Sequence, residues 1–472
     1  MRLVTVTLRS LFIQIVIVLA AAIVCACSDT GAGGEPGEPA GGGSGAAPTE
    51  TQWPAPKFPI SVVKGERYLV DADGRPFLIQ GDAAWSLIAE LSREDVERYL
   101  RDRRARGFNA VLVNLIEHKF ARHPPLNAYG DAPFAIPGDF GTPNDRYFDH
   151  ADWVLARAEQ MGLLVMLTPM YMGNGGGDEG WYQEIRRSGA DKIRDFGRYI
   201  GRRFKAHRNV LWIQGGDYNP PDKNLVRALV QGIRESDPAA LQSAHCGPET
   251  EALDYWNGEP WLDLDTIYTY EPVYLAAMRA YRRPEGLPYI LIESHYENEY
   301  RSTPLQLRTQ AFHALLSGAT GQIFGNSPIW HFDGPGLFAG PADWRTELGS
   351  RGAHSMTNIR RLFDGIAWWK LRPDLDQHLL VGGIGQGKRR AVAALASDDS
   401  FAVVYVPSDR AVAIDLGQLS GPRVRGRWYD PGLGIFAPAS RTPFPATGIR
   451  TLNERRSAVG SFDKILVLES VE

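Results

Sequence analysis

Eight short apolar segments, most of them followed by a helical pattern, constrain the fold of this 472-residue chain more than any other feature. Each is a continuous apolar run, as expected for a strand buried on both faces of a parallel sheet. The segments end near Gly81, Leu115, Thr168, Gln214, Ala244, Thr269, Ile292 and Phe324. Eight such units in about 300 residues predict a (β/α)8 barrel, the TIM barrel of the α/β class. An open doubly wound sheet is the alternative, but no glycine-rich phosphate loop follows the first segment.

The pattern changes after about residue 373, where strands and turns replace the strand–helix units. Five short strands are expected there, at 391–395, 401–406, 412–416, 424–429 and 464–468. Short strands separated by turns are typical of an antiparallel β-sandwich. We therefore predict a barrel over residues 57–372 and a C-terminal antiparallel β-sandwich over residues 373–472.

The N-terminus is expected to be a targeting segment. The apolar run at 11–24 is shorter than the ~20 residues of a membrane span but suits the core of a signal peptide. It ends in the sequence VCAC at 24–27, which resembles a bacterial lipobox. We predict that residues 1–26 are a lipoprotein signal peptide and that Cys27 carries the lipid. An ordinary secretory signal or an N-terminal membrane anchor is the alternative.

Residues 28–50 contain no large apolar side chain, so we expect a flexible tether over 27–56. Ser28, rather than Asp, follows Cys27, which resembles a sorting signal for the outer membrane. The predicted location is the bacterial cell envelope, with the membrane contacted through the N-terminal lipid anchor.

Composition excludes several classes of function. The net charge is −4, from 51 basic and 55 acidic residues, which argues against a nucleic-acid partner. Three cysteines exclude a disulfide-dense scaffold and a four-thiolate zinc ribbon. No HExxH motif or Cys/His cluster is present, so we predict no metal and no cofactor.

Polar and aromatic side chains follow the predicted strands, at the end of a barrel where active sites lie. Such groups suit a sugar, because polar groups bind hydroxyls and rings stack on the C–H face. We therefore predict a carbohydrate substrate. The predicted substrate contacts are Asp82, Trp85, Asn114, His118, Lys119, Tyr171, Tyr218, His245, Tyr268, Tyr270, His295 and Trp330.

Two carboxylates stand at the ends of opposite strands. Asp217 follows the fourth strand and Glu293 follows the seventh. Cleavage of a glycosidic bond needs an acid on the leaving oxygen and a second carboxylate opposite it, so we predict that this pair is catalytic. The alternatives are that Asp217 caps a helix or turn and that Glu293 pairs with an arginine. Glu297 is the local competitor of Glu293.

Five motifs occur in the order of a known family: GDAAWSL at 81–87, GFNA at 107–110, WIQGGD at 212–217, LIESHYE at 291–297 and GQIFGNSPIW at 321–330. The chain resembles the apiosidase-like glycoside hydrolases, glycoside hydrolase family 140 and its relatives. The resemblance implies that Asp217 is the acid/base, that Glu293 is the nucleophile and that the configuration is retained. The activity characterised in the family is release of D-apiose from rhamnogalacturonan II. Ala83 stands where threonine is usual.

The sequence WYDP at 428–431 and Gly434 are similar to the motif of a collagen-binding domain, although Gly432 stands where arginine is usual. Two other classes remain open from the sequence. A non-catalytic surface glycan-binding protein or adhesin is one. A barrel lyase or aldolase is the other; it needs a metal cluster or a Schiff-base lysine, and Lys119 is the only lysine near a strand end.

Overall fold

The computed structural model describes residues 53–341, 343–453 and 461–472. The predicted signal peptide, the lipid attachment at Cys27 and most of the expected tether lie outside these residues. Within the described part of the chain, no helix has the length and apolar character needed to cross a membrane.

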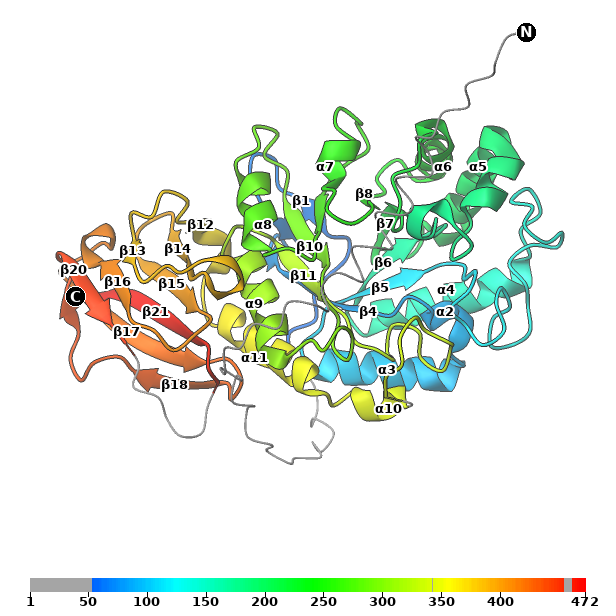
Figure 1. Cartoon of the computed structure of the whole chain (residues 1–472). Coiled ribbons are helices and arrows are strands. Elements are labelled where there is room, and N and C mark those ends of the chain that lie inside the picture. Colours follow the sequence, from blue (N-terminus) through cyan, green and yellow to red (C-terminus); the bar gives the residue numbers. More distant parts are fainter. Residues whose placement is uncertain (1–52, 342, 454–460) are drawn as a thin grey trace, which may run out of the picture. The chain divides into compact units, whose positions relative to one another are not determined.

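Eight parallel strands form one sheet with the order β8-β7-β6-β5-β4-β11-β10-β9. The strands are β4 (Ile79–Ala83), β5 (Ala110–Asn114), β6 (Leu164–Thr168), β7 (Val210–Gly215), β8 (Gln242–His245), β9 (Asp265–Tyr268), β10 (Tyr289–Glu293) and β11 (Gly321–Phe324). The two edge strands meet through hydrogen bonds. The Thr266 hydroxyl donates to the Ala244 carbonyl at 2.5 Å, and the Ser243 hydroxyl donates to the Leu264 carbonyl at 2.6 Å. The predicted (β/α)8 barrel is confirmed (Figure 1).

Helices follow most of the strands. They are α2 (Leu87–Glu90), α3 (Arg93–Ala105), α4 (Asp145–Gln160), α5 (Tyr182–Phe204), α6 (Lys223–Ser236), α7 (Ala252–Tyr255), α8 (Tyr274–Tyr281), α9 (Pro304–Leu315), α10 (Trp344–Glu347) and α11 (Arg351–Asp364). Side-chain caps define several starts: the Ser92 hydroxyl accepts from the Asp95 N–H before α3. Helix α5 has a kink at Gly189, whose φ of 74° is not helical.

Side chains alternate between two cores along each barrel strand. Ile79, Leu112, Met166 and Ile213 point into the barrel. Their neighbours, such as Val111, belong to the core under the surrounding helices. This alternation decides which strand-end residues face the barrel axis.

The C-terminal segment forms the predicted antiparallel β-sandwich. One sheet contains β12 (Leu371–Pro373), β14 (Val392–Ala396), β15 (Phe401–Val406), β21 (Lys464–Val471), β17 (Arg423–Asp430), β18 (Ile435–Pro438) and β19 (Phe444–Pro445). The second contains β13 (Leu380–Gly382), β16 (Val412–Asp415) and β20 (Ile449–Leu452). Val404, Ile414 and Leu466 are buried between the two sheets. A further small sheet, β1 (Ser61–Val62), β2 (Leu69–Val70) and β3 (Pro76–Phe77), precedes the barrel.

The larger sheet of the sandwich shares a core with barrel helices. Phe312 of α9 and Met356 of α11 belong to the same buried cluster as Val403 of β15. In this contact the guanidinium of Arg308 pairs with the Asp463 carboxylate at 2.7 Å, and both side chains are almost fully buried. The two parts therefore fold against each other through an apolar contact that contains a buried ion pair.

Candidate active site

Asp217 and Glu293 lie beside each other at the carboxyl-terminal end of the barrel, with His245 between them. One oxygen of each carboxylate and one ring nitrogen of His245 all lie within 4.8 Å of one another. The Asp217 backbone N–H donates to Nδ1 of His245 at 3.2 Å, and Nε2 lies 2.9 Å from Oε2 of Glu293. The structure thus brings together two carboxylates that are 76 positions apart in the sequence.

The tautomer of His245 follows from these contacts. A backbone N–H can only donate, so Nδ1 accepts and the ring proton lies on Nε2, where it donates to Glu293. Burial lowers the pKa of His245. The hydrogen bond to Glu293 and the charges of both carboxylates raise the pKa by more than burial lowers it, so the net shift is upward. Both nitrogens are already hydrogen-bonded, which leaves no free lone pair for a metal ion.

Two glycines place Asp217 at the end of β7. Gly215 and Gly216 have φ of 91° and 119°, which side chains rarely adopt. A Cβ at Gly216 would lie 2.4 Å from the ring of Tyr171. Tyr171 in turn donates its hydroxyl to Oδ2 of Asp217 at 2.6 Å. Helix α6 is capped by Asp222 instead, so Asp217 is not its cap.

Glu293 turns into the barrel through an irregularity in strand pairing. Ile290 and Ile292 already face the interior, so strict alternation would point Glu293 outward. The register between β10 and β9 shifts between Leu291 and Glu293. Besides His245, the Tyr270 hydroxyl lies 3.5 Å from Oε1 of Glu293. Burial and then the charge of Asp217 raise the pKa of Glu293, while hydrogen bonds from His245 and Tyr268 oppose that rise.

Several predicted substrate contacts surround this pair. The ring of Trp85 meets that of His245 edge-on at 5.4 Å, and its indole donates to the Tyr296 hydroxyl. The hydroxyls of Tyr268 and Tyr270 lie 3.0 Å apart. Together with Tyr171, these side chains form an aromatic wall around the carboxylates.

Other predicted contacts lie farther out, along the glycine-rich segment 173–180. Nδ1 of His118 lies 3.0 Å from the Asp178 carbonyl, and Lys119 lies 3.6 Å from the Glu179 carboxylate. The ring of Tyr218 packs on Tyr182, at the start of α5. His118, Lys119 and Tyr218 thus contact this segment or the helix that follows it.

Three further predicted residues lie at other strand ends. Asn114, on the inward phase of β5, donates its amide to Glu117 at 3.3 Å. The ring of His295 meets that of Tyr270 edge-on at 5.2 Å. The indole of Trp330 donates to Glu299. Their contact with a substrate stays a prediction.

Asp82 requires a correction. Its side chain is 0 % exposed and accepts hydrogen bonds from Tyr99 at 2.7 Å and Arg103 at 3.3 Å, both on α3. Asp82 stands between the inward-facing Ala83 and Gly81 on β4, so alternation turns it toward the helix. The prediction that it contacts the substrate is wrong, because it is the buried partner of Arg103.

The sequence did not predict a role for two glutamates of the strand-end loops, Glu117 and Glu299. Glu117 organises its loop: its Oε1 accepts from the backbone N–H groups of His118, Lys119 and Phe120. Glu299 is buried beside Trp330. The sequence feature that could have pointed to them is a carboxylate a few residues past a predicted strand, in a segment rich in aromatic residues.

Glu297, the competitor of Glu293, points elsewhere. It accepts from the Ser350 hydroxyl at 2.5 Å and from the Gly352 N–H at 2.7 Å. Both donors lie at the start of α11, so Glu297 binds a helix N-terminus rather than facing Asp217.

Two family models match the chain. Residues 63–370, more than half of the chain, match the model described as "Apiosidase-like, catalytic domain". The chain belongs to the apiosidase-like family. This apiosidase-like protein is a glycoside hydrolase, as the sequence predicted. Residues 375–469 match a second model, "Putative collagen-binding domain of a collagenase". No curated protein sequence matches the chain.

Solved structures share the fold of the apiosidase-like chain. One is a glycoside hydrolase family 5 protein from Bacteroides vulgatus ATCC 8482, with a TM-score of 0.77 and 21% identity over 87% of this chain and 93% of that one. Another is named only as a glycoside hydrolase, with a TM-score of 0.76 and 21% identity over 87% and 96% of the two chains. At this identity the likeness shows the fold alone.

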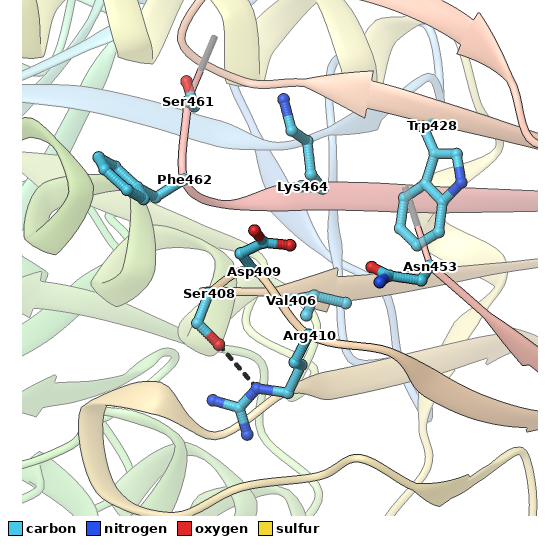
Figure 2. Close-up of a pocket in the computed structure, with 9 residues that line it drawn as sticks. All are labelled: Val406, Ser408, Asp409, Arg410, Trp428, Asn453, Ser461, Phe462 and Lys464. Carbon is cyan, nitrogen blue, oxygen red and sulfur yellow. Dashed lines mark hydrogen bonds between the residues drawn. The ribbon is translucent and has the colours of Figure 1, made fainter. Parts of the chain in front are cut away.

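The described part of the sandwich of the apiosidase-like protein contains a small cavity. That cavity is lined by Arg410, Trp428 and Lys464 among others, and Arg410 donates to Ser408 (Figure 2). Its volume is about 20 Å³, which holds about one water molecule and no sugar ring.

Proposed function

We propose that this enzyme is a retaining glycosidase in which Asp217 is the acid/base and Glu293 is the nucleophile. The observation that carries the proposal is the distance between the carboxylates, with one oxygen of each within 4.8 Å of the other. Retaining enzymes place the two groups ~5–5.5 Å apart, and inverting enzymes leave ~6.5–9.5 Å for a water molecule. The spacing here supports direct attack by a carboxylate.

In the first step Asp217 donates its proton to the glycosidic oxygen, and that oxygen leaves as an alcohol. An oxygen of Glu293 attacks the anomeric carbon and forms a glycosyl ester. In the second step Asp217 removes a proton from water, and the water oxygen attacks the same carbon and releases Glu293. Two displacements at one carbon retain its configuration.

The surrounding residues hold each carboxylate in position for these steps. The Nε2–H of His245 fixes Oε2 of Glu293, which leaves Oε1 beside Tyr270 as the attacking oxygen. The Tyr171 hydroxyl fixes Oδ2 of Asp217, which leaves Oδ1 to exchange the proton. Each carboxylate therefore has one held oxygen and one reacting oxygen.

The proposed substrate is a plant or microbial polysaccharide, with an apiosidase-like activity on rhamnogalacturonan II as the first to test. The purified protein is incubated with rhamnogalacturonan II, arabinan and a panel of microbial glycans, and products are separated by chromatography. We expect a released sugar from at least one glycan, formed first with the configuration of the substrate by NMR. An initially inverted anomer would overturn the retaining mechanism.

We further propose that the enzyme is anchored to the bacterial cell envelope, at the outer membrane, through lipid on Cys27. The support is the lipobox-like sequence and the tether composition. The Cys27→Ala variant is expected to leave the membrane fraction. Unchanged partitioning of that variant would overturn the anchor.

A further inference from the structure

One tryptophan ring contacts both of the side chains that hold the two carboxylates. The ring of Trp85 meets the imidazole of His245 edge-on, with the centroids 5.4 Å apart. The same ring contacts that of Tyr171, with the centroids 5.9 Å apart. His245 donates a hydrogen bond to Glu293 at 2.9 Å, and Tyr171 donates one to Asp217 at 2.6 Å. Trp85 therefore reaches each carboxylate through a single intervening side chain.

The backbone of Trp85 is held by two neighbouring segments. Its carbonyl accepts a hydrogen bond from the Asn114 N–H of β5 at 2.8 Å. The next residue, Ser86, donates its N–H to the Trp330 carbonyl at 3.1 Å, on the loop after β11. A shift of the Trp85 backbone would break one of these bonds, so the segment after β4 is fixed relative to the barrel.

The indole of Trp85 is held at its far end by Tyr296. Its N–H donates to the Tyr296 hydroxyl at 3.1 Å. The Tyr296 ring in turn packs on Gly325, where a Cβ would lie 2.2 Å from that ring. A rotated indole would leave its N–H buried without this acceptor, which costs about 1–3 kcal/mol. The ring of Trp85 therefore has one preferred orientation.

These contacts favour a role in positioning over stacking on a sugar. A sugar that stacks on an aromatic side chain needs one open face of the ring. Trp85 is 7 % exposed and belongs to the core inside the barrel. In a close-packed interior a rigid ring fixes the side chains that it touches. Displacement of a catalytic group by about 1 Å can lower a rate by about 10²-fold, so such a ring affects turnover without contact with the substrate.

We propose that Trp85 is a positioning residue that sets the distance between Asp217 and Glu293. It acts on Asp217 through Tyr171 and on Glu293 through His245. The inference rests on the glycosidase function proposed above. It gives Trp85 a different role from the substrate contact that the sequence predicts.

Steady-state kinetics on a cleaved glycan distinguish positioning from substrate contact. Trp85→Leu removes the ring, so we expect kcat to fall by about 30-fold while KM stays within about twofold. Trp85→Phe keeps a smaller ring beside His245 and Tyr171, and it should recover at least about fivefold of that loss. A raised KM with an unchanged kcat in Trp85→Leu would overturn the proposal in favour of a substrate contact.

Tyr296→Phe tests the same role while every ring stays in place. The substitution removes the acceptor of the Trp85 indole N–H and nothing else from that contact. We expect kcat to fall by about fivefold with KM within about twofold. This variant keeps the proposal testable if Trp85→Leu does not fold. An unchanged kcat in Tyr296→Phe would show that the orientation of the indole does not matter.

Matched controls separate positioning from a general loss of stability. Trp261→Leu removes another buried ring, whose indole donates to Glu259 at 3.0 Å shortly before β9 begins. Tyr429→Phe removes a buried hydroxyl that donates to the Asn358 carbonyl at 2.8 Å, where the sandwich meets α11. Both variants are expected to unfold at lower temperature and to keep the wild-type kcat in the folded fraction.

A double-mutant cycle tests the route through His245. In the His245→Ala background, Trp85→Leu should lower kcat by about fivefold instead of about 30-fold, because the route through Tyr171 is then the one that is left. An undiminished loss in this background would show that the ring does not act through His245, and it would overturn the proposal.

A readout without substrate is the protonation of the His245 ring. Nitrogen-15 spectra of histidine side chains report which ring nitrogen carries the proton. The wild type should show one His245 signal pattern with the proton on Nε2, identified by its loss in His245→Gln. Trp85→Leu frees the ring and should add the pattern of the Nδ1 form, whereas Trp261→Leu should not. A wild-type pattern in Trp85→Leu would contradict the positioning role.

The outcomes separate the positioning role from the function. If the wild type cleaves none of the glycans but the His245 pattern changes in Trp85→Leu, the function is wrong and the positioning stands. If the wild type cleaves a glycan and both Trp85→Leu and Tyr296→Phe behave as their controls do, the positioning is wrong and the function stands.

Discussion

Nε2 of His245 lies 2.9 Å from Oε2 of Glu293 and donates a hydrogen bond to that carboxylate. His245→Ala removes this donor, so we expect kcat to fall by about 10²-fold with little change in KM. His245→Gln places an amide N–H near the position of Nε2 and should recover part of the loss. Steady-state kinetics on a cleaved glycan, with circular dichroism as a folding control, measure both. Equal losses in the two variants would argue against the orienting role.

Asp217 should matter most when the leaving group is poor. Asp217→Asn is expected to lower kcat/KM on a natural glycan by about 10³-fold or more. An aryl glycoside of the same sugar, whose leaving group needs little protonation, should lose much less. Comparison of the two substrates with the same variant is the measurement. An equal loss on both would show that Asp217 supports the structure of the site instead.

Glu293→Ala should be inactive, and azide should restore turnover by attacking from the vacated space. The product would then be a glycosyl azide of inverted configuration, which NMR identifies. Glu297→Ala is the matched variant four residues on; it is expected to lose stability through α11 but to keep activity in the folded fraction. Normal activity in Glu293→Ala with loss in Glu297→Ala would reverse the assignment.

The pH dependence should report the raised pKa of Glu293. The proposed nucleophile acts when ionised, so activity is lost as the pH falls through its pKa, above the ordinary value of about 4.5. Because the charge of Asp217 contributes to that rise, Asp217→Asn should move the acidic limb to lower pH. The measurement is kcat/KM on an aryl glycoside from pH 3 to 8. An unmoved limb, or one moved upward, contradicts the coupling.

Asp82→Asn tests the corrected position of this residue. The substitution removes a buried partner of Arg103, which should cost about 3 kcal/mol of unfolding free energy. Asp149→Asn breaks an exposed pair with Arg203 and should change stability by less than ~1 kcal/mol. Urea unfolding measures both. An Asp82→Asn variant of unchanged stability with a raised KM would instead support the prediction that Asp82 contacts the substrate.

Periodicity predicted the barrel strands to within about two residues, because each is a buried apolar run bounded by turns. It could not decide which strand-end side chains face inward. Asp82 and Trp85 both follow the same predicted run. Asp82 faces α3 because of its phase on β4, whereas Trp85 lies two residues past β4 and packs beside His245. Glu293 faces inward through a pairing irregularity that no sequence period encodes.

The burial of Glu299 could not be predicted from the sequence for a different reason. Glu299 is buried between Asn298 and Tyr300, which have positive φ but are not glycines and so carry no sequence signal of an unusual backbone. The contacts that hold this turn come from the loop after β11. The geometry is tertiary in origin.

The ion pair between Arg308 and Asp463 lies in the apolar contact of α9 and α11 with the sandwich. This contact affects the thermal unfolding of the barrel and the sandwich. A contact that contains core side chains from both parts couples their unfolding, so calorimetry should record a single cooperative transition. The sandwich would then not be an exchangeable module. Homologues could replace it only together with the helix surfaces that receive it.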